Sequence, residues 1–165
     1  MADVSVRAAR PADAEHIAHV QQSTWAQAYA ALLGELEVPL EQVAAVWLNA
    51  IEAPPSPEHR VLVATEAGGV VGFAASEPAD DAVELSALMV EPRWGRRGHG
   101  SRLVQASVEH WSAFDVAVCW VFEADTVLSG FLQSSGWDFD GLGRGLDTAR
   151  RVVPQRRMHV SLRDG

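Results

Sequence analysis

The sequence contains no lysine, one cysteine and one tyrosine among its 165 residues. Without lysine it cannot form a P-loop, whose Gly-x-x-x-x-Gly-Lys-Ser/Thr motif holds nucleotide phosphates. Cys119 has no second cysteine with which to form a disulfide within the chain. No apolar run approaches the roughly 20 residues of a membrane-spanning helix, and the N-terminus lacks the pattern of a signal peptide. We therefore expect a cytoplasmic protein without a membrane partner.

The composition is that of a globular protein, with 48% hydrophobic and 21% charged residues. This length can bury a core without disulfides or metals, so we expect a single domain over residues 1–165. The net charge of −9 is uneven: residues 1–90 hold three arginines and 13 acidic residues, whereas residues 91–165 hold ten arginines. A basic half suits an anionic ligand and an acidic half suits a cationic amine, although a solvated surface explains the asymmetry equally well. Acidic residues interrupt the arginines, which argues against nucleic-acid binding.

Glycines mark a turn between an apolar run at 84–90 and an amphipathic stretch that follows it. Gly98 and Gly100 can adopt backbone angles that let consecutive N–H groups converge at a helix N-terminus. Arg96 and Arg97 add positive charge, so the turn suits a pyrophosphate. The alternative is a tight strand-to-helix turn with solvated arginines. A Rossmann fingerprint does not fit, because Leu103 stands where its third glycine should be.

Apolar periodicity predicts the element order β-α-α-β-β-β-α-β-α-β-β. A helix after Pro11 would present one apolar stripe, and Ala67-Gly68-Gly69 is typical of a hairpin between strands. The stripe comprises Ala14, Ile17, Ala18, Gln21, Trp25, Ala28 and Leu32. Strands are predicted at 4–6, 60–66, 70–76, 84–90, 116–122, 136–137 and 155–162, and further helices at 39–51, from 100, and at 126–134.

The segment from Leu88 to Leu103 resembles the acetyl-CoA-binding motif of the GNAT superfamily of N-acyltransferases, Gln/Arg-x-x-Gly-x-Gly/Ala at a strand-to-helix junction. The run from Arg97 to Ser101 matches, whereas Gly95 stands where glutamine or arginine is usual and Arg96 follows it. A second segment has the family's later spacing at Asp125, Phe131 and Gly136, and the N-terminal region is also similar to many members.

This resemblance implies an α/β (α+β) fold with a GNAT-like mixed central sheet, and acetyl-CoA as co-substrate with no metal. It implies transfer of an acetyl group to a primary amine of a small molecule or peptide, and it leaves a homodimer open. The cofactor-binding residues that it implies are Leu88, Met89, Val90, Arg96, Arg97, Gly98, His99, Gly100, Ser101, Asp125 and Phe131. A non-catalytic acyl-CoA-binding module of the same fold and a transferase using another acyl donor remain alternatives.

Two substitutions bear on catalysis. Asp125 replaces an asparagine that contacts the pantetheine arm in many relatives, and Leu132 replaces a tyrosine that acts near the sulfur as general acid. A thiol has a pKa of roughly 8.5, so a thiolate can leave without that acid. Backbone N–H groups near Met89 and Val90 would bind the oxyanion if this strand splays from its neighbour as in the family.

Direct attack on the thioester requires a base that deprotonates the amine, and Glu84 is our leading candidate. The alternative is a surface carboxylate on an alternating strand. Three other acids are weaker candidates: Glu77, Asp80 and Asp81.

The remaining reactive side chains are interpreted conservatively. Tyr29 is a candidate substitute acid, but an apolar helix favours a core role, and Cys119 lies in a run typical of a buried strand. The six tryptophans are expected mostly in the core, with Trp25 and Trp47 as candidate walls of an acceptor pocket.

Overall fold

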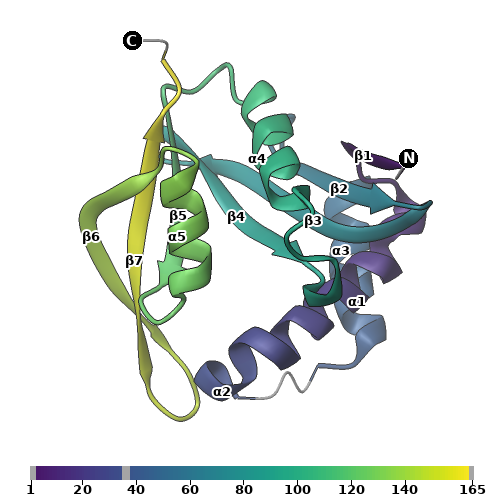
Figure 1. The fold of residues 1–165 in the computed structure, drawn as a ribbon, viewed down its shortest axis with the longest axis horizontal. Coiled ribbons are helices and arrows are strands. Elements are labelled where there is room, and N and C mark those ends of the chain that lie inside the picture. Colours follow the sequence, from purple (N-terminus) through teal and green to yellow (C-terminus); the bar gives the residue numbers. More distant parts are fainter. Residues whose placement is uncertain (1–2, 35–37, 164–165) are drawn as a thin grey trace.

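The computed structural model describes residues 3–34 and 38–163, and its seven strands form one mixed sheet with helices on both faces (Figure 1). The strand order in the sheet is β1-β2-β3-β4-β5-β7-β6. The strands are β1 (Val4–Ala8), β2 (Arg60–Glu66), β3 (Gly69–Ala79), β4 (Ala82–Val90), β5 (Val116–Phe122), β6 (Asp138–Asp147) and β7 (Val152–Ser161). The helices are α1 (Ala14–Thr24), α2 (Ala30–Leu33), α3 (Leu40–Glu52), α4 (His99–Glu109) and α5 (Thr126–Ser134). The mixed sheet is confirmed. The predicted order of elements is also confirmed when α1 and α2, which a π-helical segment joins, are counted as the one helix predicted after Pro11. None of the helices in the described ranges is long and apolar enough to cross a membrane.

Two apolar cores lie on opposite faces of the sheet. The larger core packs α4 and α5 against the strands through residues such as Leu85, Leu103 and Trp111. The smaller core joins α1 and α3 to the other face, where Ile17 and Phe73 are fully buried. Side chains alternate across a strand, so each central strand supplies residues to both cores.

The central sheet opens between β4 and β5. These parallel strands pair only at Val83 with Ala117 and at Glu84 with Val118, whereas β3 and β4 remain paired up to Val90. Beyond Glu84, β4 therefore has a free edge on the side of β5. The sequence-based expectation that this strand splays from its neighbour is confirmed.

The N-terminal helix changes its winding before the site. After α1, Trp25–Tyr29 (η2) forms a π-helical segment that leads into α2. A π-helical turn inserts an extra residue and rotates everything that follows around the helix axis. The predicted stripe holds at Ala14, Ile17 and Ala18, which are buried, and at Gln21, which is partly buried and accepts from Trp47. Beyond the insertion the stripe is wrong.

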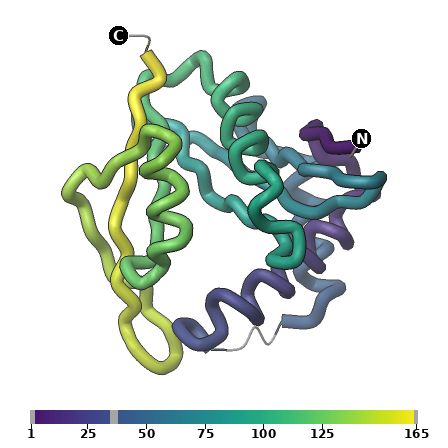
Figure 2. The backbone as a smooth tube through the Cα atoms, viewed as in Figure 1, coloured from purple at the N-terminus to yellow at the C-terminus, as the bar shows by residue number. Residues whose placement is uncertain are grey.

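The C-terminal hairpin also differs from the prediction. Strands β6 and β7 are each ten residues long, and the short strand predicted at 136–137 is instead a turn before β6. The β6–β7 turn lies against the end of α2 (Figure 2), where Arg151 donates a hydrogen bond to the Leu32 carbonyl at 3.0 Å.

Candidate active site

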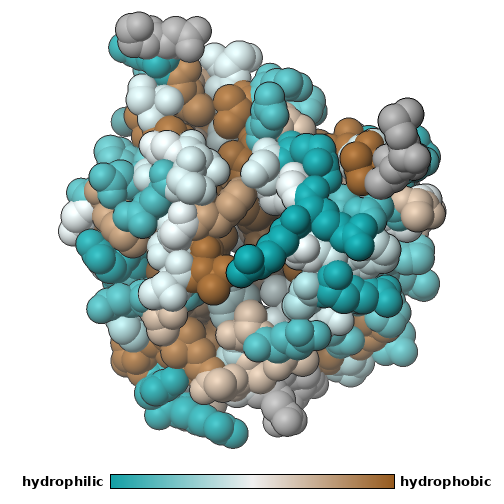
Figure 3. All heavy atoms as spheres, viewed as in Figure 1, coloured by the Kyte–Doolittle hydropathy of each residue, from teal (hydrophilic) through white to brown (hydrophobic). Residues whose placement is uncertain are grey.

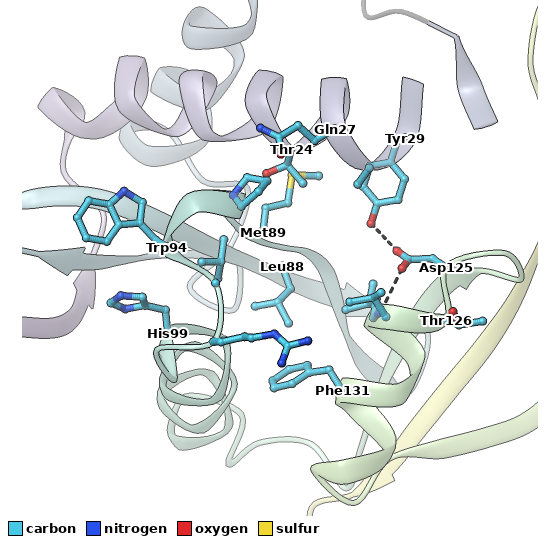
Figure 4. Close-up of a pocket in the computed structure, with 18 of the residues that line it drawn as sticks. Thr24, Gln27, Tyr29, Leu88, Met89, Trp94, His99, Asp125, Thr126 and Phe131 are labelled. Carbon is cyan, nitrogen blue, oxygen red and sulfur yellow. Dashed lines mark hydrogen bonds between the residues drawn. The ribbon is translucent and has the colours of Figure 1, made fainter. Parts of the chain in front are cut away.

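A cavity of about 900 Å³ lies where the sheet opens. Three parts of the chain line it: the end of the N-terminal helix from Thr24 to Leu32, the end of β4 with the loop into α4, and the start of α5 (Figure 4). Figure 3 shows a hollow on this face with hydrophobic residues in it and hydrophilic residues along its border. A cleft of this size suits a small organic ligand.

All the cofactor residues predicted from sequence line this cavity except Arg97. The guanidinium group of Arg97 instead donates to the Glu66 carboxylate at 2.5 Å and lies over the Trp94 ring. The prediction that both Arg96 and Arg97 present charge to the cavity is therefore wrong for the Arg97 side chain. Arg96 does line the cavity and adopts a left-handed φ of 63°, a conformation uncommon outside glycine.

The strand-to-helix turn forms a concave set of N–H groups. Gly98 has a φ of 81° and caps α4, whose first backbone bond to the cap runs from the Arg102 N–H to the Gly98 carbonyl at 3.0 Å. Within residues 3–34 and 38–163, the N–H groups of residues 98–101 have no backbone acceptor. Free N–H groups at a helix N-terminus, together with the helix dipole, form an anion site.

The free edge of β4 supplies two further donors. The Glu91 N–H donates to the Val71 carbonyl on β3 at 2.8 Å. Hydrogen bonding alternates along an antiparallel pair, so the Met89 N–H also faces β3 while the N–H groups of Leu88 and Val90 point toward the open side. The sequence predicted oxyanion donors near Met89 and Val90. The Met89 N–H is unsuitable because it faces β3, so the candidate donors are the N–H groups of Leu88 and Val90.

Glu84 lies at the apex of the opening, on the last pair that joins β4 to β5. Its neighbours Val83 and Leu85 are buried in the core on the α4 side, so its own side chain projects from the opposite face. Burial raises the pKa of the Glu84 carboxyl, and the facing Glu77 raises it further, while Arg144 and Arg157 oppose the shift. A carboxylate with a raised pKa is a better proton acceptor than an ordinary surface glutamate.

Tyr29 lies on the cavity wall rather than in the core. Its hydroxyl donates to the Asp125 carboxylate at 2.6 Å (Figure 4). Its ring packs beside Phe122. Burial and this hydrogen bond raise the pKa of the Tyr29 phenol. The interpretation of Tyr29 as a core residue is wrong, because the π-helical segment turns it toward the cavity.

Asp125 holds the start of α5 as well as Tyr29. Its second carboxylate oxygen accepts the Leu128 N–H at 3.1 Å and caps the helix. A carboxylate only accepts hydrogen bonds, so the Tyr29 hydroxyl satisfies the oxygen that faces the cavity.

We expect Tyr29→Phe to lower the free energy of unfolding by about 1 kcal/mol, because a half-buried carboxylate loses its donor. Chemical denaturation of Tyr29→Phe, Asp125→Asn and the double variant measures the coupling between the two side chains. A coupling energy near zero would show that the bond contributes nothing to stability.

Other predicted residues have structural roles. Leu132 is fully buried in the core, so α5 presents no acid at this position. Cys119 is buried as predicted, and burial raises the pKa of its thiol to about 12, which disfavours the reactive thiolate. Neither tryptophan lines the cavity: Trp25 donates to the Gly34 carbonyl and Trp47 packs on Phe73.

Sequence reasoning missed Glu66, Arg102 and Thr24. Glu66 is 6% exposed and bonds to Arg97 and His99 beneath the turn, whereas Thr24 lines the cavity. Alternation along β2 offered a signal for Glu66, because Leu62 and Ala64 point into the core below α4 and Glu66 shares their side of the strand.

Comparison with known proteins agrees with this geometry. Residues 57–138 match the family model of the acetyltransferase (GNAT) domain. No curated protein matches the chain.

Solved structures share the fold across almost the entire chain. A putative acetyltransferase, yncA, from Salmonella typhimurium, described with its cofactor acetyl-CoA, has a TM-score of 0.76 at 19% identity and covers 98% of this chain and 95% of its own. The ribosomal-protein-alanine N-acetyltransferase of Brucella melitensis has a TM-score of 0.77 at 20% identity, covering 95% and 99%. The PaiA N-acetyltransferase of Thermoplasma acidophilum, in complex with coenzyme A, has a TM-score of 0.77 at 17% identity, covering 96% and 99%. The motif, the opened mixed sheet and the family-model match agree, and the chain belongs to the GNAT acetyltransferase superfamily.

Proposed function

We propose that this protein is an N-acetyltransferase that transfers an acetyl group from acetyl-CoA to a primary amine of a small molecule or peptide. The observation that carries the proposal is one continuous cavity that contains both sets of free N–H groups, at the start of α4 and along the edge of β4. The similar structures from Salmonella typhimurium and Thermoplasma acidophilum are described with acetyl-CoA and coenzyme A, which supports the same ligand here.

The residues present fit such a ligand. The N–H groups of residues 98–101 would bind the pyrophosphate, with Arg96 adding charge. Phe131 and the edge of β4 would enclose the pantetheine arm, whose amides can pair with backbone as a neighbouring strand would. Asp125 would contribute an acceptor near the start of α5.

The coenzyme supplies an activated acetyl thioester, and the chain provides for the proton and the developing charge. Glu84 takes a proton from the amine directly or through a water, so that the nitrogen lone pair attacks the carbonyl carbon. The Leu88 and Val90 N–H groups stabilise the negative charge on the carbonyl oxygen. The C–N bond forms first and gives a tetrahedral intermediate, whose collapse breaks the C–S bond. The thiolate that leaves takes a proton from solvent, because Leu132 has none to give.

The test is calorimetric titration with acetyl-CoA, followed by a thiol-release assay over a panel of amines that includes small amines and N-terminal peptides. Binding with amine-dependent thiol release supports the proposal. Absence of acetyl-CoA binding would overturn it.

The second candidate is a non-catalytic acyl-CoA-binding module. The placement of Leu132 in the core favours it, since the helix that carries the acid in many relatives offers none here. Tight acetyl-CoA binding without thiol release for any amine of the panel would support the module over the enzyme.

A further inference from the structure

A buried ionic cluster lies directly beneath the proposed pyrophosphate turn. Glu66, at the end of β2, is 6% exposed, and a buried carboxylate is stable only when it is paired. One of its oxygens accepts from Arg97 at 2.5 Å and the other contacts His99 Nε2 at 2.8 Å. The carboxylate therefore bonds to both residues that flank Gly98.

The hydrogen bonds of Arg102 determine which His99 nitrogen carries the proton. The His99 side chain is fully buried, and its Nδ1 lies 3.1 Å from a guanidinium nitrogen of Arg102. Arginine can only donate, so Nδ1 must accept. The proton of a neutral His99 is therefore on Nε2, which donates it to Glu66.

The same arginine orients the peptide that precedes Gly98. Arg102 donates to the Arg97 carbonyl at 2.9 Å. In a trans peptide the next N–H points the opposite way, so the Gly98 N–H faces away from Arg102. Arg102 also leaves no room for a side chain at position 98, because a Cβ on Gly98 would lie 2.9 Å from its guanidinium group.

We infer that Glu66 is a positioning residue for coenzyme binding: through Arg97, His99 and Arg102 it holds the 97–99 backbone so that its N–H groups remain aimed at the pyrophosphate. Glu66 itself does not line the cavity. The conformational entropy of the turn is lost when the protein folds, so less entropy is lost when the ligand binds. This inference rests on the proposed function.

The decisive variant is Glu66→Gln. An amide offers one acceptor and one donor group, so either Arg97 or His99 would face a donor. His99 cannot resolve the conflict by moving its proton to Nδ1, because Nδ1 would then face Arg102. We expect the Kd for coenzyme A and the KM for acetyl-CoA to rise at least about tenfold, or about 1.4 kcal/mol, with kcat within about twofold.

Asp13→Asn is the matched control. Asp13 is also 6% exposed and accepts two bonds from Arg7, at 2.7 and 3.0 Å, and one from the Arg10 N–H, yet it does not line the cavity. We expect this variant to lower Tm as Glu66→Gln does while leaving the Kd for coenzyme A within about twofold.

Arg102→Met is a second variant that leaves both donors of Glu66 in place and removes those to His99 Nδ1 and the Arg97 carbonyl. It is expected to weaken coenzyme A binding about threefold or more, and it decides the matter if Glu66→Gln does not fold. Nitrogen-15 NMR of the wild type should show His99 protonated on Nε2.

The inference is overturned if these variants lower Tm but bind coenzyme A as tightly as the wild type, or if His99 carries its proton on Nδ1. A wild type that does not bind coenzyme A would instead refute the proposed function, which separates the two failures.

Discussion

Glu84→Gln is expected to lower kcat/KM by about 10²- to 10⁴-fold, the range typical of a lost general base. Glutamine keeps the size of the side chain but cannot take the proton from the amine. The KM for acetyl-CoA should change little, because Glu84 lies at the apex of the opening and does not line the cavity. Steady-state kinetics with an amine found in the thiol-release assay measures both quantities. A variant with wild-type kcat/KM would remove Glu84 as the base.

The pH dependence follows from the raised pKa of Glu84. A base works only when deprotonated, so the wild-type rate should rise with pH through a pKa above the ordinary value of 4.5, and this limb should vanish in Glu84→Gln. Stability should change in the opposite sense. The folded state holds the proton more tightly than the unfolded state, so the folding contribution of Glu84 is lost as pH rises through that window. Glu84→Gln should therefore have a higher Tm than the wild type at neutral pH.

Glu77→Gln is the control for this assignment. Glu77 pairs with Glu84 across β3 and β4, has a side chain that is 48% exposed, and raises the pKa of Glu84 by its charge. Its removal should move the acidic limb to lower pH and leave the plateau rate nearly unchanged. A plateau that falls as far as in Glu84→Gln would assign the base to Glu77.

Gly100→Val is expected to weaken acetyl-CoA binding by at least about tenfold, or about 1.4 kcal/mol. A Cβ at this position would lie 3.3 Å from the tip of the Phe131 ring, and the valine methyl groups would force the ring to move. Phe131 lines the cavity, and bulk at residue 100 would also oppose close approach of a diphosphate to the backbone. Calorimetry with coenzyme A measures the change.

Gly130→Val controls for the cost of valine in a helix. Gly130 lies in α5 with no atom within 4 Å of its ideal Cβ, and it does not line the cavity. Its coenzyme affinity should match the wild type. Equal affinity in Gly100→Val as well would count against the assignment of the turn as the pyrophosphate site.

The turn at Gly98 could be predicted because its signals are local. A strand, two glycines and an amphipathic helix follow one another within residues 84–109, and backbone geometry follows from the glycines themselves. The resemblance to the GNAT family implied Ser101 and Phe131 as cofactor residues, and the structure brings both to the cavity. It could not show that Arg97 would turn away, because its partner Glu66 lies 31 residues earlier.

Tyr29 was misplaced for two physical reasons. The prediction assumed a uniform period of 3.6 residues, and nothing in the residues from Trp25 to Tyr29 announces a π-helical turn. Its partner Asp125 lies 96 residues away, so only the folded chain brings the two together. For Trp47 the sequence left a core position and a pocket wall open, and the choice depended on how α3 crosses the sheet and packs Trp47 on Phe73.

Only two residue pairs join β4 to β5 in the described structure, so few backbone hydrogen bonds hold the two halves of the sheet together. A coenzyme lying along that seam would behave as a missing strand and contribute backbone bonds that the polypeptide does not make itself. Binding would then raise the free energy of unfolding, by about 2.7 kcal/mol at a coenzyme concentration one hundred times Kd. The free energy of unfolding would then be higher with the coenzyme bound than without it, and it would fall again when coenzyme A is released after each turnover.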